Sequence, residues 1–245
     1  MEKQRMHFLP NWLTAPTTAI QLHLIGAGGT GSTMLTALAR INYALMDSGH
    51  CGLQDTLFDD DRVDDANLGR QLFAESELGL NKAGPLISRA NRFFGTKWKA
   101  RHIRYEECRE NPATITIACV DSVASRRNIC EKMEQPTDSH HRDRPLYLLD
   151  FGNGRYSGQV LLSTIGEIAQ PKSEKFQTVS QLGNVFQTFP EMQTQQDDGL
   201  PSCSLAQALQ QQDLFINSVL SNMGVSLFWS MLRNRYTPHR AMFVN

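Results

Sequence analysis

A short apolar run that stops at a glycine-rich loop is the feature that most constrains the fold of this chain. Residues 20–25 read Ile-Gln-Leu-His-Leu-Ile, and Gly26, Gly28 and Gly31 follow them with the spacing G-x-G-x-x-G. From residue 32 to residue 43 apolar residues recur at helical spacing. A strand, a tight glycine turn and a helix in this order are typical of an α/β sheet that binds a phosphate at the helix N-terminus.

Strand-like and helical segments alternate through the first 164 residues. Short apolar or alternating runs predict further strands at 53–58, 99–105, 114–120, 146–150 and 158–164. Apolar residues at helical spacing predict helices at 32–43, 81–94 and 125–134. This alternation predicts an α/β, Rossmann-like fold, in which helices cover both faces of a mostly parallel sheet.

The composition changes after residue 164. Seven glutamines lie between Gln170 and Gln196, and periodic apolar residues are few there. A long segment of this kind inside a compact fold is usually functional or disordered. We therefore expect an ATP-binding core over residues 1–164, a long mobile crossover loop over 165–200, and a helical C-terminal part over 201–245 that packs on the core.

The glycine loop alone leaves two classes of nucleotide site open. In a nicotinamide or flavin site, Asp59 at the end of the second predicted strand would bind the ribose. Arg70 and Lys82, which follow that strand, favour ATP instead. Fixed cations and Mg²⁺ stabilise the charge that builds on a pyrophosphate leaving group, whereas a dehydrogenase does not need them.

A longer pattern carries a resemblance to a known superfamily. It consists, in order, of Asp59, Asp61 and Val63, then Asn67-Leu68-Gly69-Arg70-Gln71, then Lys82 and Asp121. From about residue 22 to residue 158 the chain resembles the ThiF/MoeB/ubiquitin-activating-enzyme superfamily, which adenylates the C-terminal carboxylate of ubiquitin-fold proteins. Its later part, residues 197–217, resembles the ThiF-related family of the bacterial PRTRC plasmid cassette.

The resemblance implies which residues bind ATP. The phosphate loop would consist of Gly26, Gly28, Gly29 and Gly31. Asp59 would hold the ribose hydroxyls, with Asp61 in the same polar network. The residues that grip the phosphates would be Asn67, Arg70 and Lys82, and the two cations would also act in catalysis.

Two further residues are assigned to the reacting carboxylate. By resemblance Asp121 would hold Mg²⁺, although an aspartate at this position also suits a helix N-cap. Pro201-Ser202-Cys203-Ser204 is similar to the Pro-x-Cys-Thr element in which ubiquitin-activating enzymes form a thioester. A helix N-terminus there would lower the pKa of the Cys203 thiol. The alternative is that Cys203 is a small buried apolar residue.

The other four cysteines are expected to be structural. None of the five cysteines belongs to a C-x-x-C pair. Many members of the superfamily hold a zinc ion with two such pairs, so no zinc is expected here.

Charge and hydropathy restrict the partners. The formal net charge of −1 and the pI of about 6.7 argue against nucleic acid and anionic membrane surfaces. The N-terminus leads into no signal-peptide core, so a cytoplasmic protein is expected. The uncharged stretch from Leu214 to Leu232 contains too many serines and asparagines to span a membrane, and it offers apolar surface for a homodimer.

These patterns favour a Mg-ATP-dependent enzyme that adenylates a ubiquitin-like protein and then forms a thioester. Three alternatives remain open at this point. They are an NAD-binding oxidoreductase, a catalytically silent ATP-binding partner or scaffold, and an enzyme that adenylates a small or RNA-borne carboxylate without a thioester.

Overall fold

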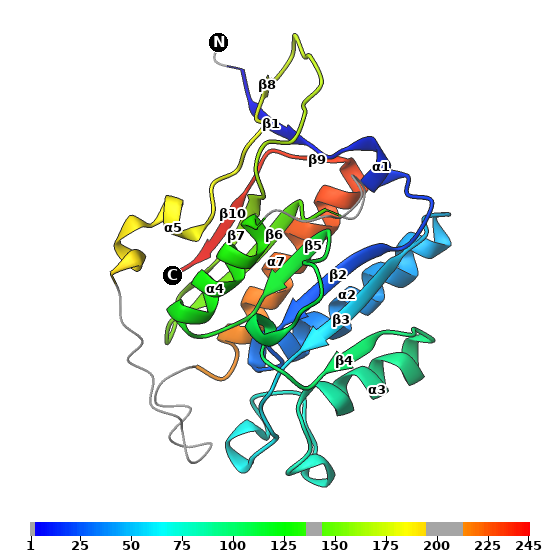
Figure 1. Cartoon of the computed structure of the whole chain (residues 1–245), viewed down its shortest axis with the longest axis vertical. Helices are drawn as coiled ribbons and strands as arrows, with labels where there is room; N and C mark the ends of the chain where they lie inside the picture. Colours follow the sequence, from blue (N-terminus) through cyan, green and yellow to red (C-terminus); the bar gives the residue numbers. More distant parts are fainter. Residues whose placement is uncertain (1–2, 136–143, 195–212) are drawn as a thin grey trace.

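The computed structural model describes residues 3–135, 144–194 and 213–245, in which seven strands form one sheet (Figure 1). Their order across the sheet is β10 (Ala241–Val244), β7 (Gly158–Thr164), β6 (Tyr147–Asn153), β5 (Ile115–Ala118), β2 (Ile20–Ile25), β3 (Leu53–Phe58) and β4 (Lys99–Arg101). The strands from β6 to β4 are parallel, and β7 runs antiparallel to β6 and to β10. The predicted α/β fold with a mostly parallel sheet is confirmed.

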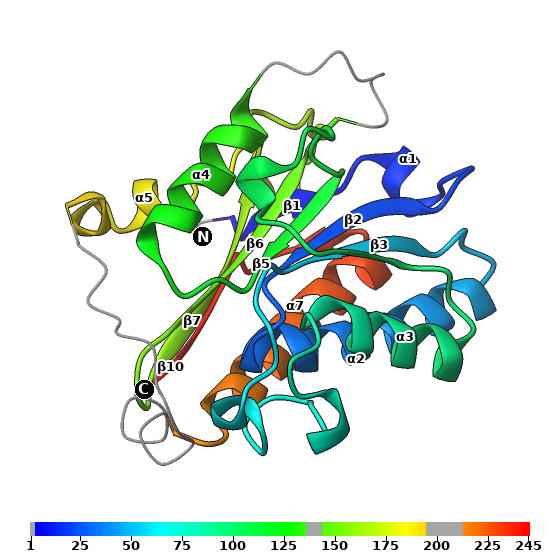
Figure 2. The same cartoon turned by 60° about the horizontal axis from the view of Figure 1, so that its bottom comes forward.

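Helices cover both faces of this sheet (Figure 2). One face carries α2 (Gly29–Asp47), α3 (Ala83–Phe94) and α7 (Ile216–Asn234). The other carries α4 (Val123–Glu134) and α5 (Val185–Thr188). The two faces have separate apolar cores, and all four residues of β5 are buried between them. Burial on both faces explains why the central strands read as near-continuous apolar runs.

The strand order reverses at β2 and β5, and open α/β sheets carry a ligand-binding crevice at such a point. The chain continues from β2 to β3 and β4 on one side, whereas β5 and β6 lie on the other. β2 and β5 are paired from Leu22 with Ile115 to Ile25 with Ala118. In open α/β sheets ligands bind outside the carboxyl ends of the strands at such a reversal of strand order. The glycine loop follows β2 and Asp121 follows β5, so both lie at this point.

A second sheet ties together segments that are far apart in the sequence. Among the described residues its order is β8 (Gln177–Thr178), β1 (Arg5–Phe8) and β9 (Tyr236–Thr237). The N-terminal strand β1 therefore contacts both the segment 165–200 and the C-terminal part, while β10 joins the large sheet. The C-terminal part was expected to be helical, but it also contains the strands β9 and β10. Strands of two to four residues are too short to show a periodicity in sequence.

Several boundaries differ from those predicted. Helix α2 begins at Gly29 instead of residue 32, because packing excludes side chains at Gly29 and Gly31 and overrides the poor helix propensity of glycine. The strand predicted at 99–105 is β4, which ends at Arg101, and residues Tyr105–Glu107 form a 3-10 turn. The short helix α1 (Asn11–Thr14) was not predicted. The described part of the glutamine-rich segment contains β8, α5 and the 3-10 turn Pro190–Gln193.

The uncharged stretch from 214 to 232 forms most of α7. Six of its apolar side chains are buried against the sheet and α2; they are Ile216, Leu220, Leu227, Phe228, Met231 and Leu232. Phe215 and Val219 are exposed. Only part of the apolar surface of this stretch is therefore open to a second copy. No helix in the described part of the chain combines the length and apolar character needed to cross a membrane.

Candidate nucleotide-binding site

Two of the loop glycines are required by close backbone packing. Gly26 has a φ of +91°, and a Cβ atom there would lie 2.6 Å from the carbonyl oxygen of Cys119. A Cβ atom at Gly31 would lie only 1.8 Å from the carbonyl oxygen of Gly26. Only glycine allows the ends of β2 and β5 and the first turn of α2 to approach so closely.

Gly28 is different, because a Cβ atom there would meet nothing within 4 Å. It is the N-cap of α2, and no side chain caps that helix. The first N–H groups of an α-helix have no partner within the helix, so an uncapped N-terminus favours an anion. The loop therefore presents peptide N–H groups toward open space at the crevice, as a phosphate site requires.

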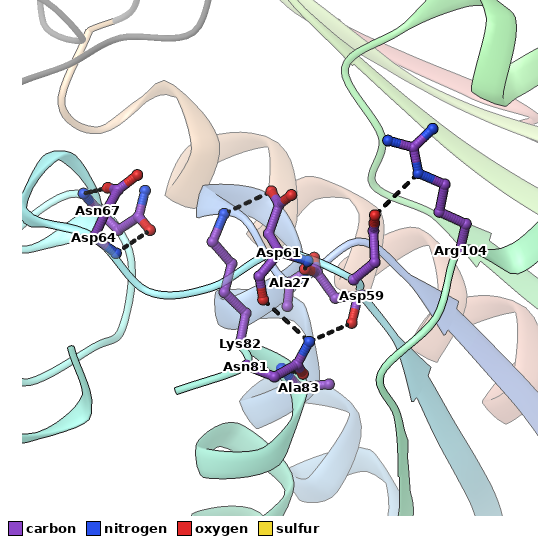
Figure 3. Close-up of polar contacts among 10 residues, drawn as sticks. Ala27, Asp59, Asp61, Asp64, Asn67, Asn81, Lys82, Ala83 and Arg104 are labelled. Atoms are coloured by element: carbon purple, nitrogen blue, oxygen red, sulfur yellow. Dashed lines mark hydrogen bonds and ion pairs between the residues drawn. The ribbon is translucent and has the colours of Figure 1, made fainter. Parts of the chain in front are cut away.

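Asp59 holds the glycine loop from the end of β3. Its carboxylate accepts hydrogen bonds from the backbone N–H groups of Ala27, at 2.6 Å, and Asp61, at 2.9 Å (Figure 3). Burial raises the pKa of Asp59 to about 6, while the Ala27 N–H and the Lys82 ammonium act in the opposite direction. The side chain is thus mostly ionised at neutral pH and lies where a ribose hydroxyl would need an acceptor.

Lys82 lies beside the acidic run, at the start of α3. Its Nζ atom is 2.9 Å from Oδ2 of Asp61, and the lysine is buried whereas the Asp61 carboxylate is largely exposed. Asn81, which the sequence analysis did not single out, donates from Nδ2 to the carbonyl oxygens of Asp59 and Asp61. Its Oδ1 atom accepts from the N–H of Ala83, so Asn81 fastens the acidic run to α3 (Figure 3).

Asn67 forms a reciprocal pair with Asp64. Its amide oxygen accepts from the Asp64 N–H at 3.0 Å, and its own N–H donates to the Asp64 carboxylate at 3.1 Å. This capping box closes the short 3-10 turn Asp65–Asn67 and buries Asn67. The amide oxygen is therefore engaged, and only the amide NH₂ group remains suited to an oxygen of a phosphate.

Arg70 and Asp121 lie close enough to interact electrostatically. Burial lowers the pKa of the half-buried Arg70, and the nearby carboxylates of Asp64 and Asp121 oppose this shift. Asp121 is exposed just beyond β5. The N-cap of α4 is Ser122, whose Oγ accepts from the N–H of Ser125 at 3.0 Å. Asp121 is thus not the helix cap, and its carboxylate faces the solvent beside Arg70.

Two polar clusters that support the site were missed in the sequence. Oδ1 of Asn217, at the start of α7, accepts from the Thr30 hydroxyl at 3.0 Å and from Nδ2 of Asn153 at 2.7 Å. The buried Arg126 forms an ion pair with Asp150 at 3.1 Å. Its Nη2 atom also donates to the carbonyl oxygens of Val120 and Phe151, which follow β5 and lie within β6 respectively. Both clusters join residues that are remote in sequence. The only indication of them in the sequence is that polar residues occur within otherwise apolar segments.

The described cysteines near the site are poorly suited to nucleophilic attack. Cys119, beside the glycine loop, and Cys130 have thiol pKa values raised by burial, to about 12 in the case of Cys130. Cys51 is exposed, although it was expected to lie in or beside the core. Cys203 lies outside the described residues, so its role stays a prediction. No group of three or more metal-binding side chains occurs in residues 3–135, 144–194 and 213–245.

Known proteins resemble this chain in sequence and in fold. The model of the ThiF family matches residues 17–209. E. coli MccB has a TM-score of 0.59 at 14% identity, over 96% of this chain and 61% of MccB. PaaA has a TM-score of 0.59 at 13% identity, over 95% of this chain and 70% of PaaA. For MccB with AMPCPP and selenomethionine-labelled MccA, the values are 0.53 and 16%, over 89% and 57% of the chains.

These structural matches are informative about the fold. The chain spans about three fifths of the MccB chains that it matches. No curated protein matches the sequence. The family model covers well over half of the chain. The chain belongs to the ThiF family.

Proposed function

We propose that this protein binds Mg-ATP at the glycine loop and transfers AMP to a carboxylate, with release of pyrophosphate. One observation carries the proposal. The uncapped N-terminus of α2 opens onto the crevice between β2 and β5, and Arg70, Lys82 and Asp121 border the same crevice. An anion-binding helix end with two cations and a solvent-facing carboxylate suits the expulsion of pyrophosphate better than the binding of NAD.

In the proposed reaction a carboxylate oxygen attacks the α-phosphorus of ATP. The bond from the α-phosphorus to the oxygen that bridges it to the β-phosphorus breaks, and pyrophosphate leaves with that electron pair. The N–H groups of the glycine loop hold the phosphates, while Asp59 accepts from the ribose hydroxyls. Arg70 and Lys82 stabilise the charge that develops on the leaving group. Lys82 would exchange Asp61 for a phosphate oxygen when ATP binds.

The residues present fit a magnesium ion. In nucleotide sites Mg²⁺ is commonly held by one or two carboxylates together with phosphate oxygens. Asp121 supplies an exposed carboxylate at the crevice. When bound, Mg²⁺ would neutralise phosphate charge and orient the α-phosphate.

The substrate that the family resemblance favours is the C-terminal carboxylate of a ubiquitin-like protein. The acyl group would then pass from AMP to the thiol of Cys203, and the enzyme would act as a homodimer. MccB, which shares the fold, has been crystallised with AMPCPP, an ATP analogue, together with MccA. That structure supports a site of this type that holds a nucleotide and a second molecule at once.

The experiment is ATP–pyrophosphate exchange with each purified small protein that is encoded beside the gene. Arg70→Ala and Lys82→Ala should each slow exchange by about 100-fold or more, as for other fixed stabilisers of transition-state charge. Arg92→Ala is the matched control, because Arg92 is an exposed cation in the last turn of α3. Equal rates of exchange in the wild type and in these three variants would contradict the assigned site.

A second readout separates adenylation from thioester formation. Wild type incubated with Mg-ATP and the partner should form an adduct that dithiothreitol releases. Cys203→Ala should lose this adduct and keep exchange, since adenylation needs only the nucleotide site. An adduct that persists in Cys203→Ala would show that Cys203 is not the acceptor. ATP binding without exchange on any carboxylate would assign the chain to a catalytically silent partner instead.

A further inference from the structure

A cavity of about 160 Å³ lies far from the glycine loop, beside the small sheet. Helix α7 begins at the loop, where Asn217 bonds Thr30, and leads at its other end to β9 and the cavity. Nineteen helical residues span about 28 Å. The small sheet lies at the opposite end of the molecule from the start of α7 (Figure 1). The cavity is thus separate from the candidate nucleotide site.

The buried residues that line the cavity, which form its floor, offer a ligand no free side-chain polar group. It includes buried Met6, His7, Leu182 and Thr237. Nδ1 of His7 lies 2.7 Å from the carbonyl oxygen of Val179 and so carries the hydrogen, while Nε2 accepts from the Tyr147 hydroxyl at 2.9 Å. The Thr237 hydroxyl is engaged with the backbone N–H and carbonyl of His239. With these groups satisfied, the floor suits an apolar body.

The rim of the cavity is basic. It carries exposed Arg5 and His239 and half-buried Arg240. No carboxylate lines the cavity, and in the part of the chain that the structure describes neither arginine forms an ion pair. Nη1 of Arg240 donates to the carbonyl oxygen of Gly183 and to the Thr188 hydroxyl, both at 3.1 Å. These bonds orient the guanidinium group without neutralising its charge.

We propose that this cavity binds a carboxylate attached to a small apolar body of about six carbon atoms. The apolar body would lie on the floor, with the carboxylate between Arg5 and Arg240. The size fits, because an apolar protein cavity of about 150 Å³ holds a benzene ring. The charge fits as well, because the guanidinium fork matches a carboxylate. Short branched or aromatic carboxylic acids share this chemistry with the C-terminal leucine of a peptide.

The test is calorimetric titration of the full chain with benzoate and with 4-methylpentanoate. Acetate lacks the apolar body and benzyl alcohol lacks the charge, so each serves as a half-ligand control. We expect saturable binding of both full ligands, and affinities at least about tenfold weaker for both half-ligands. Absence of benzoate and 4-methylpentanoate binding at millimolar concentration would overturn the proposal.

Variants locate the binding site. Arg5→Gln removes an exposed rim charge and should weaken both ligands at least about tenfold. Val179→Phe should block binding by filling the cavity, and the backbone carbonyl that bonds His7 is retained. Lys3→Gln is the matched control, because it removes one positive charge two residues before Arg5 and does not line the cavity. Equal affinities in Arg5→Gln, Val179→Phe and Lys3→Gln would refute the assigned site.

Peptides distinguish the two sources of this carboxylate. A tetrapeptide that ends in leucine is titrated with a free and with an amidated C-terminus. Binding of the free form, lost on amidation, would identify the end of a polypeptide chain as the ligand. Binding of 4-methylpentanoate without binding of the free peptide would identify a small carboxylic acid.

Discussion

Asp55 should make the stability of this protein depend on pH. It lies in the middle of β3, wholly buried, on the face packed by α2 and α3, and its register partner is Leu22. Neither carboxylate oxygen makes a hydrogen bond of acceptable geometry. Burial raises the pKa of Asp55 to about 8, and the backbone N–H groups of Thr56 and Leu24 lower it only in part. Asp55 is therefore mostly protonated in the folded protein at neutral pH.

The sign and size of the effect follow from proton linkage. The folded pKa of Asp55 is about 8, and the pKa in the unfolded chain is about 3.9. Between these values the folded protein binds one proton more than the unfolded chain. The free energy of unfolding therefore falls as the pH rises, by about 1.4 kcal/mol per pH unit. From pH 5 to pH 7 this residue alone should cost about 3 kcal/mol.

Urea denaturation at pH 5, 6, 7 and 8 measures this directly. Asp55→Asn cannot take up the proton, so the difference in unfolding free energy between the variant and wild type should shift by about 3 kcal/mol in favour of the variant from pH 5 to pH 7. The contributions of other titrating groups, such as Asp59, are common to both proteins and cancel in this difference. Asp47→Asn, at an exposed position of α2, is the control for loss of a surface carboxylate. A pH-independent difference for Asp55→Asn would show that Asp55 does not carry a proton in the folded protein at neutral pH.

Three further results are expected at and around the site. The affinity for Mg-ATP should fall as the pH is lowered from 7 to 5. Asp59 has a pKa of about 6, and its protonated carboxyl group accepts hydrogen bonds from the ribose poorly. In calorimetry, Asp59→Asn should flatten this dependence on pH. Gly28→Ala should keep wild-type stability but weaken ATP binding, whereas Gly31→Ala, which meets backbone at 1.8 Å, should unfold at lower urea concentration. Arg126→Ala should cost about 3–5 kcal/mol in urea denaturation, because it leaves Asp150 buried without its partner.

Elements that are specified locally were the ones predicted well from the sequence. β2 at 20–25, β3 at 53–58 and β7 at 158–164 have the predicted bounds, because each is an apolar or alternating run with a clear stop. The short strands β1, β8, β9 and β10 were missed. They exist through pairing with distant partners, such as Arg5 with Gln177, and not through their own composition.

The sequence predicted which residues follow the strands at the glycine loop, but it could not predict their contacts. In the structure Asp59 bonds Ala27, Lys82 pairs with Asp61, and Arg70 interacts electrostatically with Asp121. Their assignment to a nucleotide site stays a prediction. The sequence did not reveal that Asn217 supports the loop, since its partner Thr30 is 187 positions away. Nor did it reveal the environment of Asp55. In an alternating strand an aspartate would be placed toward solvent, but both faces of β3 are covered here.

If the glycine loop, Arg70 and Lys82 form an ATP site, calorimetric titration will detect it without knowledge of the acceptor. The full chain is titrated with Mg-ATP and, separately, with NAD. The account predicts saturable Mg-ATP binding that Asp59→Ala and Gly28→Ala weaken strongly, and NAD binding that is much weaker or undetectable. Tight NAD binding with no Mg-ATP binding would contradict it and would assign the loop to a dinucleotide site.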